Sequence, residues 1–131
     1  MIGLDTNVVV RYIMQDDPKQ ARLASALIEK LTVDDPGFVP LVGIIELVWV
    51  LSSSFELARA QITSALEILL QIKEIQVERA EVVWRALRVY RDSSADFADC
   101  VVERSAAAAG CLRTMTFDRG SAKNCSMTLI Q

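Results

Sequence analysis

Apolar and polar positions along the chain alternate between short apolar runs and longer segments with helical spacing. The short runs predict strands at Met1–Leu4, Phe38–Val39, Glu74–Val77, Leu112–Thr116 and Met127–Ile130. The longer segments predict helices at Thr6–Met14, Pro18–Leu31, Leu57–Ile72 and Arg79–Tyr90, and a helix that begins at Pro40 and carries Glu46 and Trp49. A further helix is predicted from Ser94 or Asp96 to about Ala109, where Gly110 ends it. This alternation is typical of an α/β fold with a parallel sheet. No linker, repeat or low-complexity segment interrupts it, so we expect one domain over residues 1–131.

Composition indicates a globular, helix-rich protein, with 52% hydrophobic residues, five Gly and three Pro. The longest apolar stretch, Phe38–Leu51, contains Glu46 and is too short to span a bilayer. The N-terminus lacks the pattern of a secretory signal, and the three cysteines form no C-x-x-C pair. We therefore expect a cytoplasmic protein with no membrane partner.

The chain is acidic, with a formal net charge of −3 at pH 7 and a pI near 4.9. Proteins that bind nucleic acid mainly through phosphate contacts are usually basic. Any nucleic-acid role must therefore depend on a local basic patch, a metal ion or a partner.

Four carboxylates interrupt or end apolar stretches: Asp5, Glu46, Asp99 and Asp118. Burying such groups unpaired would be costly, and close neighbours would raise one another's pKa. A hard divalent cation would remove both problems. Because the chain has no histidine and no cysteine pair to bind zinc, the residues favour an all-oxygen magnesium or manganese site.

Each acid also has an ordinary structural interpretation. Asp5, at a strand end before a helix, is as compatible with a helix N-cap as with a ligand site. Glu46 has no Lys or Arg three or four positions away, which favours function over a solvent-facing edge. Asp96 and Asp99, spaced i, i+3, share a helix face, although charge at a helix N-terminus is itself mildly stabilising. Asp118 alone could be a turn residue.

Several other classes of site are excluded or disfavoured. Without histidine there is no Ser-His-Asp or Cys-His catalysis, and no glycine-rich phosphate-binding motif is present. Cys100 has no activating neighbour. We interpret Trp49 and Trp84 as core or interface residues, and Arg11 and Arg119 as the best candidates for a phosphate contact.

With these residues in view, the whole chain resembles the PIN-domain ribonucleases, and among them the VapC-type toxins of toxin–antitoxin pairs. The resemblance lies in Ile2–Tyr12, Asp16–Pro18, Ile45–Leu51, Asp96–Val102 and Thr116–Arg119. Cys100 is a departure, because small apolar residues are commoner there.

The resemblance implies a three-layer α/β/α fold with a central parallel sheet and a Mg²⁺- or Mn²⁺-dependent endoribonuclease. Its implied catalytic acids are Asp5, Glu46, Asp99 and Asp118, with Asp5 and Asp99 as the principal metal ligands. The implied auxiliary residues are Asp96, Thr6, Asn7 and Thr116. A homodimer, an RNA substrate and a small cognate antitoxin protein are implied as well.

Two alternatives stay open at this stage. One is phosphoryl transfer on an acidic α/β scaffold, which fits poorly because Asp5-Thr6-Asn7 lacks a D-x-D pair and Thr116-Phe117-Asp118 offers no lysine. The other is a non-catalytic binding module that uses the same acids. The RNA target, the cleavage site, the number of metal ions and toxicity in the host do not follow from the sequence.

Overall fold

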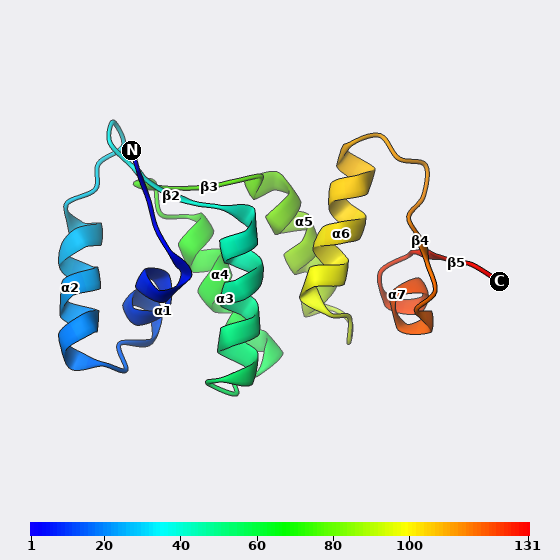
Figure 1. The fold of residues 1–131 in the computed structure, drawn as a ribbon, viewed down its shortest axis with the longest axis horizontal. Helices are drawn as coiled ribbons and strands as arrows, with labels where there is room; N and C mark the ends of the chain where they lie inside the picture. The colour runs from blue at the N-terminus through cyan, green and yellow to red at the C-terminus, as the bar shows by residue number, and fades with distance from the viewer. The chain divides into compact units, whose positions relative to one another are not determined.

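The computed structural model describes all 131 residues, which form two compact units, Met1–Ala80 and Glu81–Gln131 (Figure 1). Each unit contains its own small sheet, and every strand pairing is parallel. The predicted α/β class with parallel strands is thereby confirmed, while a single domain over residues 1–131 stays a prediction. None of the helices is both long and apolar enough to cross a lipid bilayer.

The sheet of unit 1 contains β1 (Ile2–Gly3), β2 (Gly37–Val39) and β3 (Ile75–Val77), in that spatial order. Ile2 pairs with Gly37, and Gly37 pairs with Ile75. Gly37 is needed here because a Cβ at this position would lie 2.8 Å from Cδ1 of Leu4 and 2.9 Å from Cδ1 of Leu31. Leu4, which makes this close approach, lies between β1 and Asp5.

Four helices complete unit 1: α1 (Thr6–Met14), α2 (Pro18–Glu29), α3 (Leu41–Ser53) and α4 (Arg59–Leu70). Asp17 caps α2 by accepting a hydrogen bond from the Gln20 N–H, and Pro18 occupies its first turn. Fully buried aliphatic side chains come from helices and strands alike: Val9, Val39, Ile44, Leu47, Leu51, Ile62 and Leu66. Burial of this apolar surface is the main term that holds α1 and α3 in place.

Unit 2 is built from α5 (Ala80–Arg91), which begins at the boundary, α6 (Phe97–Ala108), β4 (Met115–Thr116), α7 (Arg119–Asn124) and β5 (Thr128–Leu129). Tyr90 and Phe97 meet edge to face, with ring centroids 5.6 Å apart and planes at 89°. Asp96 is the N-cap of α6, and Gly110, at φ 95°, follows its C-terminal end. Both ends of α6 therefore lie where the sequence predicted them.

The predicted elements are confirmed apart from their exact ends, with three differences. Helix α7 (Arg119–Asn124) is not among the predicted elements, since a turn is the ordinary structural interpretation of Asp118 before Arg119 and Gly120. The two C-terminal strands were expected to complete one central sheet, whereas β4 and β5 pair with each other in unit 2. Trp49, predicted to be a core or an interface residue, does not lie in the core, since 66% of its surface is exposed.

Candidate active site

In unit 1, Asp5 lies between β1 and α1, where the chain turns from strand to helix. It occupies the N-cap position of α1, with φ −72° and ψ 155°, but its side chain makes no capping hydrogen bond. Asp5 is exposed, as is Asn7 two residues further along the chain. The Asp5 carboxylate is therefore not used to cap α1, and it is available for another role.

Glu46 of α3 is connected to the start of α1 through Thr6. The Thr6 hydroxyl is buried and donates to Oε1 of Glu46 at 3.3 Å, which is long for a bond between oxygens. The Glu46 side chain is exposed and shares a helix edge with exposed Val42 and Trp49. The sequence suggested apolar surroundings for Glu46, and this expectation was wrong. Val42 lies four residues before Glu46 and Trp49 three residues after it, so all three share the exposed edge of α3.

In unit 2, Asp96 and Asp99 occupy the N-terminal turn of α6. Oδ1 of Asp96 accepts a hydrogen bond from the Asp99 N–H at 3.2 Å, so Asp96 has the capping role that was its ordinary interpretation. Asp99 is half-buried, and its Oδ2 accepts a hydrogen bond from the Ser121 hydroxyl at 3.0 Å. Asp99 is the only one of the four predicted catalytic acids that is not exposed.

Asp118 follows β4 and caps the short helix α7. Its Oδ1 accepts from the N–H groups of Gly120, at 2.7 Å, and Ser121, at 3.4 Å. Its own N–H donates to the hydroxyl of Thr116 at 3.0 Å. Thr116, predicted as an auxiliary residue, thus fixes the backbone at the strand end from which Asp118 projects.

A cavity of about 150 Å³ in unit 2 brings three of the predicted acids together. Its lining is Asp96, Asp99, Asp118, Ser94, Ala95, Gly120, Ser121, Asn124 and Cys125. Two of these acids, Asp99 and Asp118, are joined through Ser121, which gives a hydrogen bond to each. Unit 2 therefore presents a small cavity with three carboxylates at its wall.

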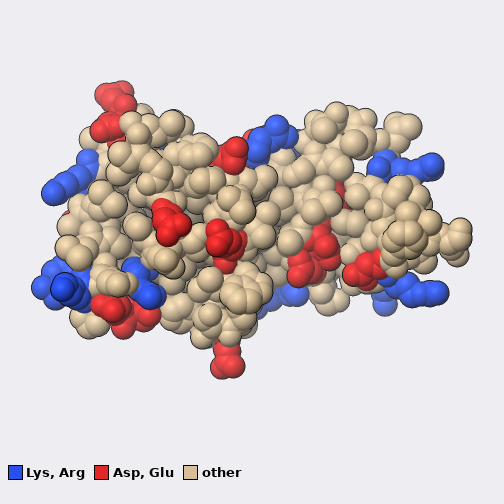
Figure 2. Space-filling model, in the orientation of Figure 1, with Lys and Arg blue, Asp and Glu red and all other residues tan.

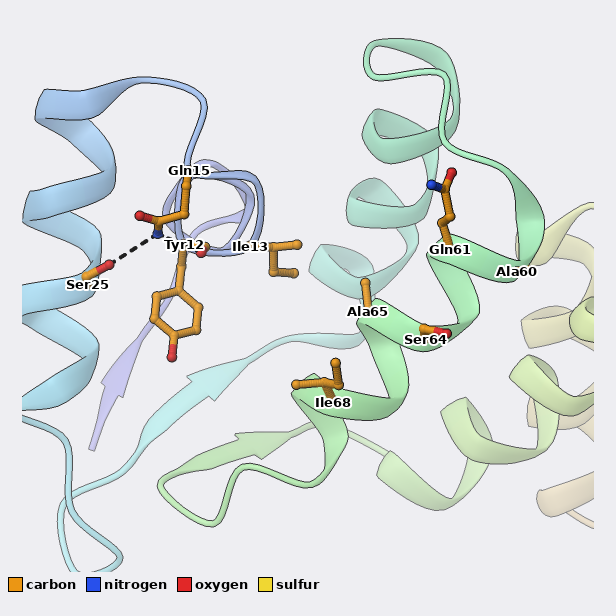
Figure 3. A pocket seen from close by; sticks show the side chains of 9 residues that line it. All are labelled: Tyr12, Ile13, Gln15, Ser25, Ala60, Gln61, Ser64, Ala65 and Ile68. Atoms are coloured by element: carbon orange, nitrogen blue, oxygen red, sulfur yellow. Dashed lines mark hydrogen bonds between the residues drawn. The ribbon is translucent and has the colours of Figure 1, made fainter.

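Unit 1 contains a larger cavity of a different character. It has a volume of about 800 Å³, lies among α1, α2 and α4, and is lined by Tyr12, Ile13, Gln15, Ser25, Ala60, Gln61, Ser64, Ala65 and Ile68 (Figure 3). Within it, the Gln15 amide donates to the Ser25 hydroxyl at 3.2 Å. No carboxylate lines it, so it does not offer the chemistry expected of the acids.

The donor groups at the acidic cavity fit a hard divalent cation in kind. Carboxylate, hydroxyl and amide oxygens are what Mg²⁺ and Mn²⁺ bind, and Mg²⁺ usually retains several waters beside one or two carboxylates. The structure contains no group of three or more acidic or thiol side chains arranged to surround one ion. The residues therefore suit a largely hydrated ion better than a closed protein cage.

The negative charge at this cavity affects a neighbouring thiol. Burial raises the pKa of Cys125, and the charges of Asp99, Glu103 and Asp96 raise it further against a lowering contact with Cys100. Cys125 is thus held protonated and is not an activated nucleophile. Glu103 itself is paired with Arg104, and this hydrogen bond raises the pKa of Arg104.

Positive charge is sparse in both units. On the face shown in Figure 2, Lys and Arg side chains form separate groups, with no continuous basic area over either unit. Arg11, a predicted phosphate contact, is bound instead to Asp16 and Gln20. Arg119 is exposed at the first position of α7, next to Asp118. Of the two predicted arginines, only Arg119 retains that role as a candidate.

Sequence reasoning missed Ser121 and Asn124, which line the acidic cavity. Both lie on α7, whose 6 residues include a glycine and show no apolar periodicity. The only sequence feature that indicated helix α7 was Asp118. Aspartate is common at helix N-caps, but it is also common in turns.

Two comparisons with known proteins bear on these residues. The family model of the PIN domain matches residues 2–125. A VapC ribonuclease of Aquifex aeolicus (strain VF5) is 26% identical over 116 residues, which cover 88% of this chain and 86% of the relative. The range that the family model matches, residues 2–125, includes every predicted site residue of both units.

Proposed function

This chain belongs to the PIN-domain family, and we propose that it is a divalent-metal-dependent endoribonuclease that hydrolyses RNA phosphodiester bonds. The observation that supports this most directly is the unit 2 cavity, where Asp99 and Asp118 are held by shared hydrogen bonds. The likeness to a VapC ribonuclease supports RNA as the substrate class. The preference of carboxylate oxygens for hard cations supports Mg²⁺ or Mn²⁺ as the ion.

We assign the catalytic role to Asp5, Glu46, Asp99 and Asp118. Asp5 and Asp99 would hold the ion, directly or through water, while Glu46 and Asp118 would orient the attacking water. A bound Mg²⁺ or Mn²⁺ supplies positive charge that acidifies water and stabilises charge on phosphoryl oxygens. The auxiliary residues position these acids: Asp96 caps α6, Thr6 donates to Glu46, and Thr116 fixes the backbone of Asp118.

The acidic composition determines how the substrate can be bound. Without a continuous basic surface on the face shown in Figure 2, phosphate contacts depend on the ion and on a few arginines such as Arg119. Hydrolysis by an attacking water would leave 5′-phosphate and 3′-hydroxyl ends. The protein should therefore require millimolar Mg²⁺ or Mn²⁺ for substrate binding as well as for cleavage.

The sharpest test of the assignment is Asp5→Asn. The Asp5 carboxylate makes no capping bond, so the substitution should leave the protein folded and abolish magnesium-dependent cleavage of structured RNA. Cleavage is measured on labelled RNA with and without EDTA, and folding by circular dichroism.

A matched control is Asp34→Asn, which removes one exposed carboxylate of the same unit from a turn between α2 and β2. This variant should cleave at the wild-type rate. Wild-type-like, EDTA-sensitive cleavage by the Asp5→Asn protein would refute the assignment.

We further propose that this nuclease is the toxin of a type II toxin–antitoxin pair and acts as a homodimer in the cytoplasm. The likeness to a VapC ribonuclease supports the toxin role, and a small antitoxin protein would then be its cognate partner. A short neighbouring gene that encodes a DNA-binding protein would support the toxin role. The absence of such a gene would favour a solitary housekeeping nuclease.

A further inference from the structure

Ser121 joins the two acids of the unit 2 cavity. Its hydroxyl donates to Oδ2 of Asp99 at 3.0 Å, and its backbone N–H donates to Oδ1 of Asp118 at 3.4 Å. The side chain is only 5% exposed, so water competes little for the hydroxyl. One residue of α7 thus connects α6 with the end of β4.

The neighbouring Gly120 makes this arrangement possible. A Cβ at Gly120 would lie 3.2 Å from Oδ1 of Asp118, closer than side chains normally approach. Its absence lets the carboxylate of Asp118 fold back over the start of α7, where it accepts from the Gly120 and Ser121 N–H groups. The same backbone turn brings the Ser121 hydroxyl to Asp99.

The bond to Asp99 has a consequence for metal binding. A carboxylate with one oxygen held by a donor has lost the freedom to rotate, and its other oxygen keeps its lone pairs for a ligand. Oδ1 of Asp99 receives no hydrogen bond from unit 2. Carboxylates that bind metals are commonly oriented by such outer partners, whose loss typically weakens metal affinity about 10–100-fold.

We infer that Ser121 is a positioning residue, which holds Asp99 through Oδ2 so that Oδ1 is presented to the divalent ion. This inference depends on the proposed function, because it takes Asp99 as a metal ligand. Ser121 itself need not touch the ion or the RNA. Its effect should therefore appear in metal affinity first, and in catalysis only when the metal is limiting.

The experiment compares Mn²⁺ affinity, by electron paramagnetic resonance of free Mn²⁺, for the wild type and four variants of the full chain. Ser121→Ala removes the hydroxyl and Ser121→Thr keeps it. Ser105→Ala is the matched control, since Ser105 lies on α6 but does not line the acidic cavity. Asp99→Asn reports whether the measured site is the proposed one.

We expect Ser121→Ala to weaken Mn²⁺ binding by about 10-fold or more, Ser121→Thr to retain most of the affinity, and Ser105→Ala to match the wild type. RNA cleavage by Ser121→Ala should approach the wild-type rate when Mn²⁺ is raised in proportion. A merely structural role would lower thermal stability without this rescue.

The outcomes separate two failures. If the wild type binds Mn²⁺ and Asp99→Asn does not, yet folded Ser121→Ala binds as tightly as the wild type, the positioning role is refuted and the nuclease proposal survives. If the wild type neither binds Mn²⁺ nor cleaves RNA, both are refuted. Should Ser121→Ala fail to fold, Ser121→Cys, which keeps the size and weakens the donor, carries the same expectation.

Discussion

The acids of the two units are held in different ways. In unit 2, Asp99 accepts a hydrogen bond from the Ser121 hydroxyl at 3.0 Å, and Asp118 accepts from the Gly120 N–H at 2.7 Å and from the Ser121 N–H at 3.4 Å. Both acids line one cavity. In unit 1, Asp5 makes no capping bond, and Glu46 accepts only a 3.3 Å bond from Thr6. The first pair is oriented by the fold, whereas the second pair keeps its side-chain freedom.

This difference indicates where preorganisation resides. Ordering an exposed Glu costs up to about 2 kcal/mol of side-chain entropy, which must be offset when it takes up a fixed position. For Asp99 the entropy of the side chain is already lost on folding, because Ser121 and the packing of α6 hold it. Asp99 should therefore contribute more to binding of the ion than Glu46.

The largest expected contrast is in metal affinity. Asp99→Asn should lower Mn²⁺ affinity by at least about 10-fold, whereas Glu46→Gln should change it by less than about 3-fold. Isothermal titration with Mn²⁺ measures both, and Asp92→Asn, an exposed acid paired with Arg91, serves as the charge control. Equal losses in the Asp99 and Glu46 variants would remove the distinction between the units.

A smaller contrast concerns stability. Asp96→Ala should lower the free energy of unfolding by about 0.5–2 kcal/mol, because the N-cap bond to the Asp99 N–H is lost. Asp96→Asn keeps an equivalent cap and should restore stability. Asp5→Ala should cost less than about 0.5 kcal/mol, since no side-chain cap is lost. Urea unfolding checks all three, and a cost for Asp5→Ala equal to that for Asp96→Ala would contradict the comparison.

The smallest effect is on a thiol of the unit 2 cavity. Burial and nearby carboxylates raise the pKa of Cys125, so the folded protein keeps it protonated where the unfolded thiol ionises. The associated stabilisation is complete below the unfolded pKa of about 8.5 and is lost as the pH rises towards the folded value. At pH 8, iodoacetamide should label exposed Cys111 well before Cys125, as read by mass spectrometry. Equal labelling rates in the native protein would show that the cavity is open.

Most of the fold followed from local patterns. Thr6–Met14 begins after Asp5 and keeps helical spacing, and α6 begins at an Asp cap and ends before Gly110, so both helices lie as predicted. The family match over residues 2–125 agrees with the resemblance drawn from the motifs. Helix α7 could not be predicted, because six residues with a glycine show no periodicity and depend on Asp118 and tertiary contacts.

The candidate site was predictable in its residues and less so in its environment. The chain without histidine pointed to acids and a hard cation, and Asp96, Asp99 and Asp118 do line one cavity. Burial was misjudged at Glu46, because apolar neighbours in sequence do not decide which edge of a helix faces solvent. The meeting of Asp5 and Glu46 with the acids of unit 2 stays a prediction.

By itself the sequence determined the α/β class, the family and the order of every element except α7, since spacing, caps and residue chemistry are local properties of the chain. The catalytic roles of the acids that it indicated stay a prediction. Only the tertiary structure decided that Ser121, 22 residues after Asp99, holds that carboxylate. The same is true of the exposure of Glu46. The physical reason is that side-chain orientation and burial depend on which elements pack together, and helix α7, which carries Ser121, has no periodic pattern that would indicate it.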